Sequence, residues 1–469
     1  MNTPLVSGRT IIHDTTASKG RGGVFLDFLR CFSLVRNTTK IFSTNVPPKV
    51  ITSINGLRVI SMFWVILGHT FLFMLTSYIM ANPVDLVEDT SKFSMMVIMN
   101  GYFCVDTFFF LSGLLVSYTC FRKLEKSEGK FNWFLFYFHR YVRLTPSMMF
   151  VILFYVKLTP FLAYSPTWTL RKNEHCQKYW WTNLIYINNF YPTKFDDECV
   201  GWTWYLANDM QFYIISPFVL ILAHRFGRVG LLASAGSLFM VSTIALASIY
   251  GHYNIDPLAL SKWGQSDLFN PAKADFTKMV YDKPYCRIQP YLIGMMLGYF
   301  IHKSYSGTRK PNWFFALIAW LAAIAIGITL VYAPHDATLK DGRAWKTAEN
   351  VIYGMFSKAA WGVALAWVVY ACHYGFGGLI QRFLSARFWI PLSRLTYSTY
   401  LVHPIVLTYI YSSSKTTLYY DTTTVTFYFI TAVVLSYACA FILSVVTEFP
   451  CDNLENFAVK LFGRKKRLN

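Results

Sequence analysis

The feature that most constrains this chain is a series of ten long apolar segments along its 469 residues. About 20 apolar residues are enough to carry a helix across the hydrocarbon core of a bilayer. The sequence therefore predicts an all-α fold, a polytopic membrane helix bundle with about ten transmembrane helices. The ten segments are residues 57–80, 101–120, 146–163, 202–223, 229–250, 286–302, 312–333, 350–371, 389–411 and 425–447.

The composition agrees with this interpretation. Only 14% of the residues are charged and 54% are hydrophobic, whereas soluble globular proteins carry about 25% charged residues. This balance excludes a soluble enzyme, a disordered chain and a small secreted module held together by disulfides.

The loops between the apolar segments alternate in charge. Residues 1–58 hold eight Lys or Arg and two acids, and residues 120–145 hold six Lys or Arg and two acids, while the loops of the other side are balanced or acidic. Because cytoplasmic loops carry the excess of Lys and Arg, we expect both termini in the cytosol. This bias and an attraction to anionic membrane lipids account for the net charge of +19. We expect no nucleic acid as a partner, since no basic run is interleaved with aromatic residues outside the apolar segments.

The chain divides into three parts. Residues 1–50 are expected to form a flexible basic cytosolic tail, with residues 25–32 on the membrane surface. Residues 51–455 form the transmembrane domain, and residues 456–469 a basic cytosolic tail. Asn37 begins a glycosylation sequon, but this topology places it in the cytosol, where we expect it to stay unmodified. The sequence predicts a multi-pass membrane protein and does not distinguish the plasma membrane from the endoplasmic reticulum.

The nine cysteines lack metal-ligand spacing, so we expect no metal site. Cys176 and Cys199 share one outside loop, where an oxidising compartment favours a disulfide between them. The alternatives are a pairing of either with Cys286, or free thiols.

Two ionisable residues in the first apolar segment are candidate functional groups. Arg58 and His69 are eleven residues apart, so in an α-helix they lie on one face, separated by a rise of about 16 Å. Arg58 at the cytosolic rim suits a phosphate, and His69 at mid-depth suits proton transfer near neutral pH. The structural alternative is an arginine that snorkels to the surface and a histidine that bonds a neighbouring helix.

Asp106 and Asp209 lie in the outer parts of the second and fourth segments. If either meets His69, its carboxylate can orient the imidazole and raise its basicity. Alternatively, each aspartate pairs with a helix N-terminus or with Lys358.

Arg140 and Arg143 end an aromatic and basic stretch and are three residues apart, so they share one helix face at the cytosolic surface. Together with Arg58 they can form a phosphate clamp, or they can simply anchor the helix at the membrane surface. His403, Tyr397 and Glu448 are secondary polar candidates in or beside the last two segments. His403 precedes Pro404, which frees a backbone carbonyl for another hydrogen bond.

Taken in order over about residues 50–455, these segments resemble the acyltransferase 3 family of integral membrane O-acyltransferases, and in particular its animal, nose-resistant-to-fluoxetine-like branch. The residues that carry the resemblance are Gly56-Leu57-Arg58 with His69, Phe108 to Gly113, Arg140 to Pro146, Trp204-Tyr205-Leu206 with Asp209, Ser393 to Ser398 with His403, and Glu448-Phe449-Pro450. Animal members often carry a cysteine-rich luminal domain after a signal peptide, and residues 1–50 have neither feature.

The resemblance implies a ten-helix bundle that transfers an acyl group from cytosolic acyl-CoA to a hydroxyl acceptor of lipid or glycan type. It implies His69 as general base and Arg58, Arg140 and Arg143 as acyl-donor ligands, with acyl-CoA as donor substrate and no metal. The competing hypotheses are a lipid or xenobiotic carrier without covalent chemistry, and a membrane receptor or scaffold.

Overall fold

The computed structural model describes residues 21–47, 50–77, 80–165, 168, 174–193, 197–253, 255–258, 276–304, 312–339 and 341–468. Within these ranges the regular structure is helical, and an isolated β-bridge joins Met80 to Leu418. The all-α prediction is therefore confirmed.

Each predicted apolar segment lies mainly or wholly in a long helix. These helices are α3 (Ser53–Leu75), α6 (Phe103–Lys126), α7 (Trp133–Lys157), α10 (Trp204–Tyr253), α12 (Pro284–Ser304), α13 (Trp313–Tyr332), α15 (Thr347–Tyr374), α17 (Trp389–Ser412) and α18 (Thr422–Leu443). Segments 202–223 and 229–250 both fall in α10, which breaks between them at Gly227 (φ 62°, ψ −136°). A positive φ of this kind is one that glycine adopts readily.

Six helical stretches among the described residues are long and apolar enough to cross a membrane. They are Ser53–Leu75, Phe103–Lys126, Gly201–Tyr253, Trp313–Thr338, Thr347–Tyr374 and Thr422–Val459. The chain is thus a multi-pass membrane protein, while the number of ten spans and the cytosolic placement of both termini stay predictions.

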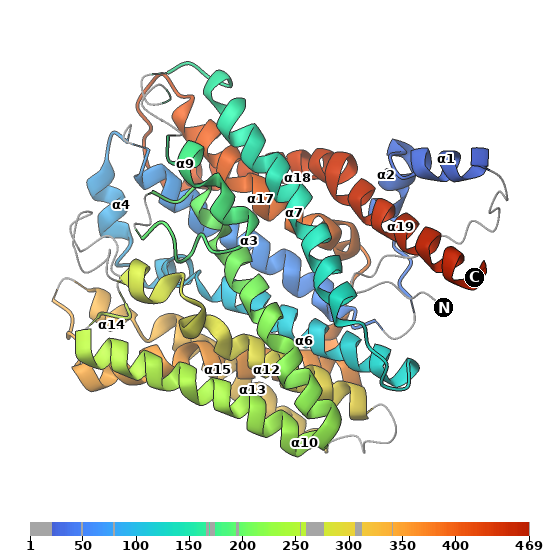
Figure 1. The fold of residues 1–469 in the computed structure, drawn as a ribbon. Coiled ribbons are helices and arrows are strands. Elements are labelled where there is room, and N and C mark those ends of the chain that lie inside the picture. Colours follow the sequence, from blue (N-terminus) through green and yellow to red (C-terminus); the bar gives the residue numbers. More distant parts are fainter. Residues whose placement is uncertain are drawn as a thin grey trace.

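The short elements of the predicted loops gather at opposite ends of the bundle (Figure 1). Helices α4 (Pro83–Asp89) and α14 (His335–Thr338), from predicted outside loops, lie at the left of the view. Helices α1 (Arg21–Arg30), α2 (Leu34–Phe42) and α19 (Phe449–Leu468), from the predicted cytosolic ends, lie together at the right. This arrangement agrees with the alternation of the loops in the sequence.

The expectation of a flexible tail is wrong for residues 21–43, which form α1, α2 and their caps, and residues 1–20 lie outside the described part. Ser33 caps α2 by accepting a hydrogen bond from the Arg36 amide. At the other end of α2, the buried Arg394 of α17 donates to the carbonyls of Lys40, Ile41 and Ser43. Helix α2 is therefore fixed to the bundle by a guanidinium that satisfies its last carbonyls.

Asn37 of α2 is fully buried, and its side-chain oxygen accepts a hydrogen bond from Asn453 of α19. Helix α19 runs through residue 455, where the sequence predicted the end of the transmembrane domain. The prediction that the sequon stays unmodified rests on the predicted topology and stays a prediction.

The tightest contact between long helices joins α6 to α12, and small residues make it possible. A Cβ atom added to Gly113 of α6, or to Gly294 of α12, would overlap the backbone of the other helix. A Cβ at Gly298 would lie 2.5 Å from the carbonyl oxygen of Leu114. Close approach of backbones at glycine is the usual way in which membrane helices maximise van der Waals contact.

We predict that Gly298→Ala lowers the thermal stability of the purified protein in detergent. The added methyl group forces α6 and α12 apart, and overpacking of this kind costs about 1–3 kcal/mol. Gly236→Ala in α10 is the matched control, because a Cβ there meets nothing within 4 Å. Equal midpoints of thermal unfolding for the two variants would contradict the prediction.

Candidate active site

His69 of α3 is paired with a second histidine, His403 of α17. Nδ1 of His69 lies 2.8 Å from Nε2 of His403, and the two ring planes are within 5° of each other. The ring centroids are 5.0 Å apart, so the imidazoles meet edge to edge and share one N–H···N hydrogen bond.

The backbone around Pro404 fixes which nitrogens carry the protons. Proline has no N–H, so the Tyr400 carbonyl, four residues earlier in α17, lacks its usual helical partner. Nδ1 of His403 lies 2.8 Å from that carbonyl oxygen and 3.2 Å from the Thr399 carbonyl oxygen. A carbonyl only accepts hydrogen bonds, so Nδ1 of His403 is the protonated nitrogen.

The consequence passes along the chain of hydrogen bonds to His69. With its proton on Nδ1, neutral His403 accepts through Nε2, so the donor to it is Nδ1–H of His69. Neutral His69 then has its lone pair on Nε2, and within the described part of the chain nothing bonds to that nitrogen. His69 is half-buried and His403 is fully buried. The pair therefore has one basic nitrogen without a partner among the described residues, Nε2 of His69, while its other three ring nitrogens are engaged in hydrogen bonds.

Arg58 lies on the same helix as His69, eleven residues earlier, as the sequence required. Its side chain is half-buried and close enough to Arg140 and Tyr205 to interact electrostatically with both. Its guanidinium forms no hydrogen bond or ion pair with any described residue, so the N–H groups of Arg58 are available to a ligand.

Arg140 of α7, by contrast, forms an ion pair with Asp209 of α10. Ser112 of α6 completes this group: its hydroxyl donates to Asp209 at 2.6 Å and lies 3.3 Å from an N–H nitrogen of Arg140. The guanidinium also lies over the ring of Tyr213, 4.6 Å from its centroid. The sequence predicted Arg140 and Asp209 as candidates but not that they neutralise each other.

Asp106 of α6 forms a buried ion pair with Arg287 of α12, at 3.0 and 3.1 Å. Neither Asp106 nor Asp209 bonds to His69, so the hypothesis that one of them orients the imidazole is wrong. Asp106 also interacts electrostatically with Lys358, the alternative partner, but more weakly than with Arg287. The group that hydrogen-bonds the imidazole of His69 is His403. In the sequence, Pro404 was the signal for this role, because a proline leaves the Tyr400 carbonyl free to hold His403.

Tyr397, Arg143 and Glu448 lie near one another on the α7–α17 side of the bundle. The hydroxyl of Tyr397 donates to the Leu144 carbonyl at 2.6 Å. Glu448 is buried and accepts hydrogen bonds from Ser398 (2.8 Å) and Ser444 (2.9 Å). These contacts join α7, α17 and the π-helical element η6 (Ser444–Glu448) that follows α18.

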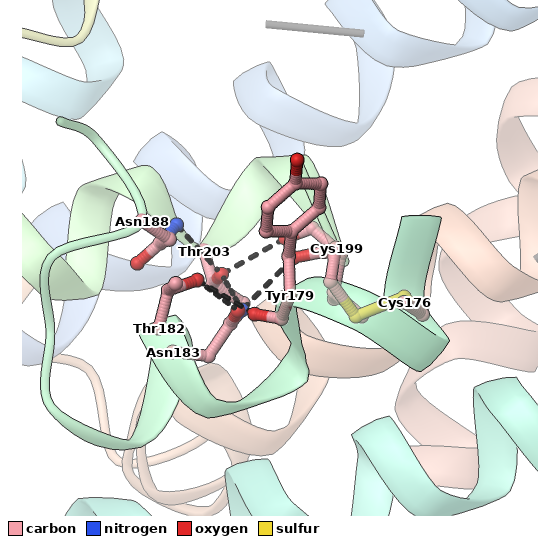
Figure 2. Close-up of a disulfide and its surroundings, with 8 residues drawn as sticks. Cys176, Tyr179, Thr182, Asn183, Asn188, Cys199 and Thr203 are labelled. Carbon is pink, nitrogen blue, oxygen red and sulfur yellow. Dashed lines mark hydrogen bonds between the residues drawn. A yellow bond between two sulfur atoms is a disulfide. The ribbon is translucent and has the colours of Figure 1, made fainter. Parts of the chain in front are cut away.

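Cys176 and Cys199 form a disulfide, the pairing that the sequence favoured, and Cys286 is a free buried thiol. Figure 2 shows how the disulfide and its surroundings brace the start of α10. Asn183 of α9 (Glu174–Leu184) donates to the Cys199 carbonyl at 2.9 Å and to the Thr203 hydroxyl at 2.7 Å. Since Thr203 immediately precedes α10, this network holds the helix that carries Asp209.

The amino-acid sequence places the chain in a known class of membrane protein, the acyltransferase 3 family. The model of that family, described as an acyltransferase domain, matches residues 51–445. The chain belongs to the acyltransferase 3 family.

Among individual proteins, the chain is 34% identical over 467 residues to "Nose resistant to fluoxetine protein 6" of Caenorhabditis elegans, a match that covers 95% of this chain and 55% of that protein. It is 25% identical over 438 residues to "Regulator of hypoxia-inducible factor 1" of the same organism, covering 88% of this chain and 80% of that protein. The "O-acetyltransferase OatA" of Staphylococcus aureus is 31% identical over 151 residues, 31% of this chain and 24% of that protein. The chain thus spans about half the length of the first of these relatives. No solved structure matches.

We predict that Asp209→Leu strongly destabilises the protein and that Arg140→Met in the same chain restores most of the loss. Removing one partner of a buried ion pair leaves the other charge uncompensated, at a cost of roughly 3–5 kcal/mol, whereas an apolar replacement of both is often neutral. The measurement is thermal unfolding in detergent. Arg343→Met, which breaks an exposed pair with Glu349, is the control and should change little. A double variant no more stable than the single one would count against the pairing.

Proposed function

We propose that this chain is an integral membrane acyltransferase that transfers an acyl group from acyl-CoA at the cytosolic face to a hydroxyl acceptor, with His69 as general base. The observation that supports this most is the His69–His403 pair, which leaves one basic nitrogen, Nε2 of His69, without a partner among the described residues. Membership of the acyltransferase 3 family and the similarity to an O-acetyltransferase support the reaction class and the hydroxyl acceptor.

The proposed reaction begins when Nε2 of His69 takes the proton of the acceptor hydroxyl. The acceptor oxygen then attacks the thioester carbonyl of acyl-CoA, and the resulting tetrahedral intermediate expels the CoA thiolate as the new ester forms. The proton on His69 passes to that thiolate, which leaves as the free thiol, so His69 returns to its starting state. General-base assistance of this kind contributes about 10²- to 10⁴-fold to a rate.

His403 serves this reaction as a positioning residue. When His69 becomes an imidazolium, its Nδ1–H still donates to Nε2 of His403, so the developing charge is stabilised without a change of geometry. The carbonyl freed by Pro404 holds His403 in the tautomer that makes this possible.

Arg58 is the guanidinium best suited to the phosphates of the acyl donor, because it has no partner of its own among the described residues. The positive charge of Arg140 is offset by Asp209, so we propose that Arg140 supports Arg58 by placing a second guanidinium nearby rather than by a full free charge. Arg143, near the middle of α7, stays a proposed donor ligand.

We expect His69→Ala to reduce acyl transfer by about 10²- to 10⁴-fold, because the general base is lost. His403→Ala should reduce it by about 10- to 100-fold, because the tautomer of His69 is no longer fixed. Transfer is measured by mass spectrometry of lipids and glycans from membranes supplied with isotope-labelled short acyl-CoA.

The control for both variants is His252→Ala, an exposed histidine at the end of α10. Full transfer by a stably expressed His69→Ala protein would refute the proposed mechanism. Movement of a lipid or xenobiotic across the membrane without any labelled ester would favour the carrier hypothesis instead.

We also expect Arg58→Met to raise the KM for acyl-CoA about tenfold or more while changing kcat less. A charge-assisted hydrogen bond to a phosphate contributes roughly 1.5–3 kcal/mol, and 1.4 kcal/mol corresponds to a factor of ten. Arg382→Met in α16 (Gly378–Leu384), an exposed arginine, is the control and should leave the KM unchanged. An unaltered KM in Arg58→Met would remove Arg58 from the donor site.

A further inference from the structure

A second group of charged side chains lies buried between α6, α12 and α15, apart from the histidine pair. Its members are Asp106, Arg287 and Lys358, whose residues are 0%, 1% and 4% exposed. Two of the three are cations. At bilayer depth an uncompensated charge is costly, so a group with one excess positive charge calls for a physical explanation.

Arg287 and Asp106 satisfy each other. One terminal nitrogen of the guanidinium donates to both carboxylate oxygens, and Nε donates to the Tyr281 carbonyl at 2.9 Å. The guanidinium is also surrounded by aromatic rings, with its carbon 4.9 Å from the centroid of Tyr281 and 5.6 Å from that of Trp204. The negative charge of Asp106 is therefore already neutralised by Arg287.

Lys358 of α15 is the member without a partner. It is close enough to Arg287 and Asp106 to interact electrostatically with both, but its ammonium forms no hydrogen bond and no ion pair in the part of the chain that the structure describes. The residue is buried, and the three N–H donors of its ammonium have no hydrogen-bond acceptor among the described residues beside a second cation. A buried ammonium in this state is expected to be neutralised by a ligand or by loss of its proton.

We propose that Lys358 and the neighbouring Arg287–Asp106 pair form a binding site for a small monovalent anion, either a free halide or the carboxylate of a small organic acid. One negative charge balances the group, and Nζ of Lys358 supplies the hydrogen-bond donors. Arg287 adds long-range attraction. The site is separate from His69 and does not rest on the proposed acyl transfer.

The test is the midpoint of thermal unfolding of the full chain in detergent, titrated with sodium bromide or sodium acetate at constant ionic strength. Sodium gluconate, whose six-carbon carboxylate is much bulkier than acetate, is the reference salt. We expect a saturable rise of about 2–5 °C, since a ligand that binds only the folded state stabilises it by mass action. A rise with bromide alone indicates a halide site, and a rise with acetate alone indicates a carboxylate site. A rise with both indicates a site that accepts either.

Lys358→Met should abolish the rise, and its midpoint in gluconate should equal or exceed that of the unaltered chain, because the excess charge is gone. Lys358→Gln provides a second variant without the charge. Lys415→Met, an exposed lysine, is the matched control and should keep the rise. The proposal is overturned if neither anion gives a saturable rise in the unaltered chain, or if the rise persists in the Lys358 variants.

Discussion

Hydrocarbon offers no hydrogen bonds, so each polar side chain inside a membrane bundle has to be satisfied by another part of the protein. Three such pairs join helices that are far apart in the sequence: His69 with His403, Arg140 with Asp209, and Asp106 with Arg287. They fix the relative positions of six long helices. Among the groups that lack a partner within the described residues, Nε2 of His69, Arg58 and Lys358 are the ones that we propose as ligand sites.

Tyr400 connects the histidine pair to the rest of the bundle. Its carbonyl holds His403, its hydroxyl donates to the Trp202 carbonyl, and its ring lies 5.4 Å from that of Tyr205. The start of α10 is in turn braced by the network around the Cys176–Cys199 disulfide (Figure 2). The geometry of the proposed base thus depends on the folding of the segment between α7 and α10 as well as on α3 and α17.

Much of the fold could be predicted, because apolar length and charge bias act locally along the chain. The apolar segments coincide with long helices, and Gly227 divides the two segments that share α10. The prediction that residues 21–43 are flexible was wrong, because these residues are held in place by hydrogen bonds from Arg394 and Asn453, several hundred residues away in the sequence. The single-residue candidates His69 and Arg58 rested on helical spacing, which is also a local property.

The sequence by itself therefore determined that this is an all-α membrane bundle, and that Arg58 and His69 share one face of its first long helix, because helix periodicity and hydrophobic length need no partner. Only the tertiary structure decided which charges meet. Asp106 and Asp209 each pair with an arginine, and His69 pairs with another histidine. These partners depend on how the helices pack and on the requirement that each buried polar group be hydrogen-bonded.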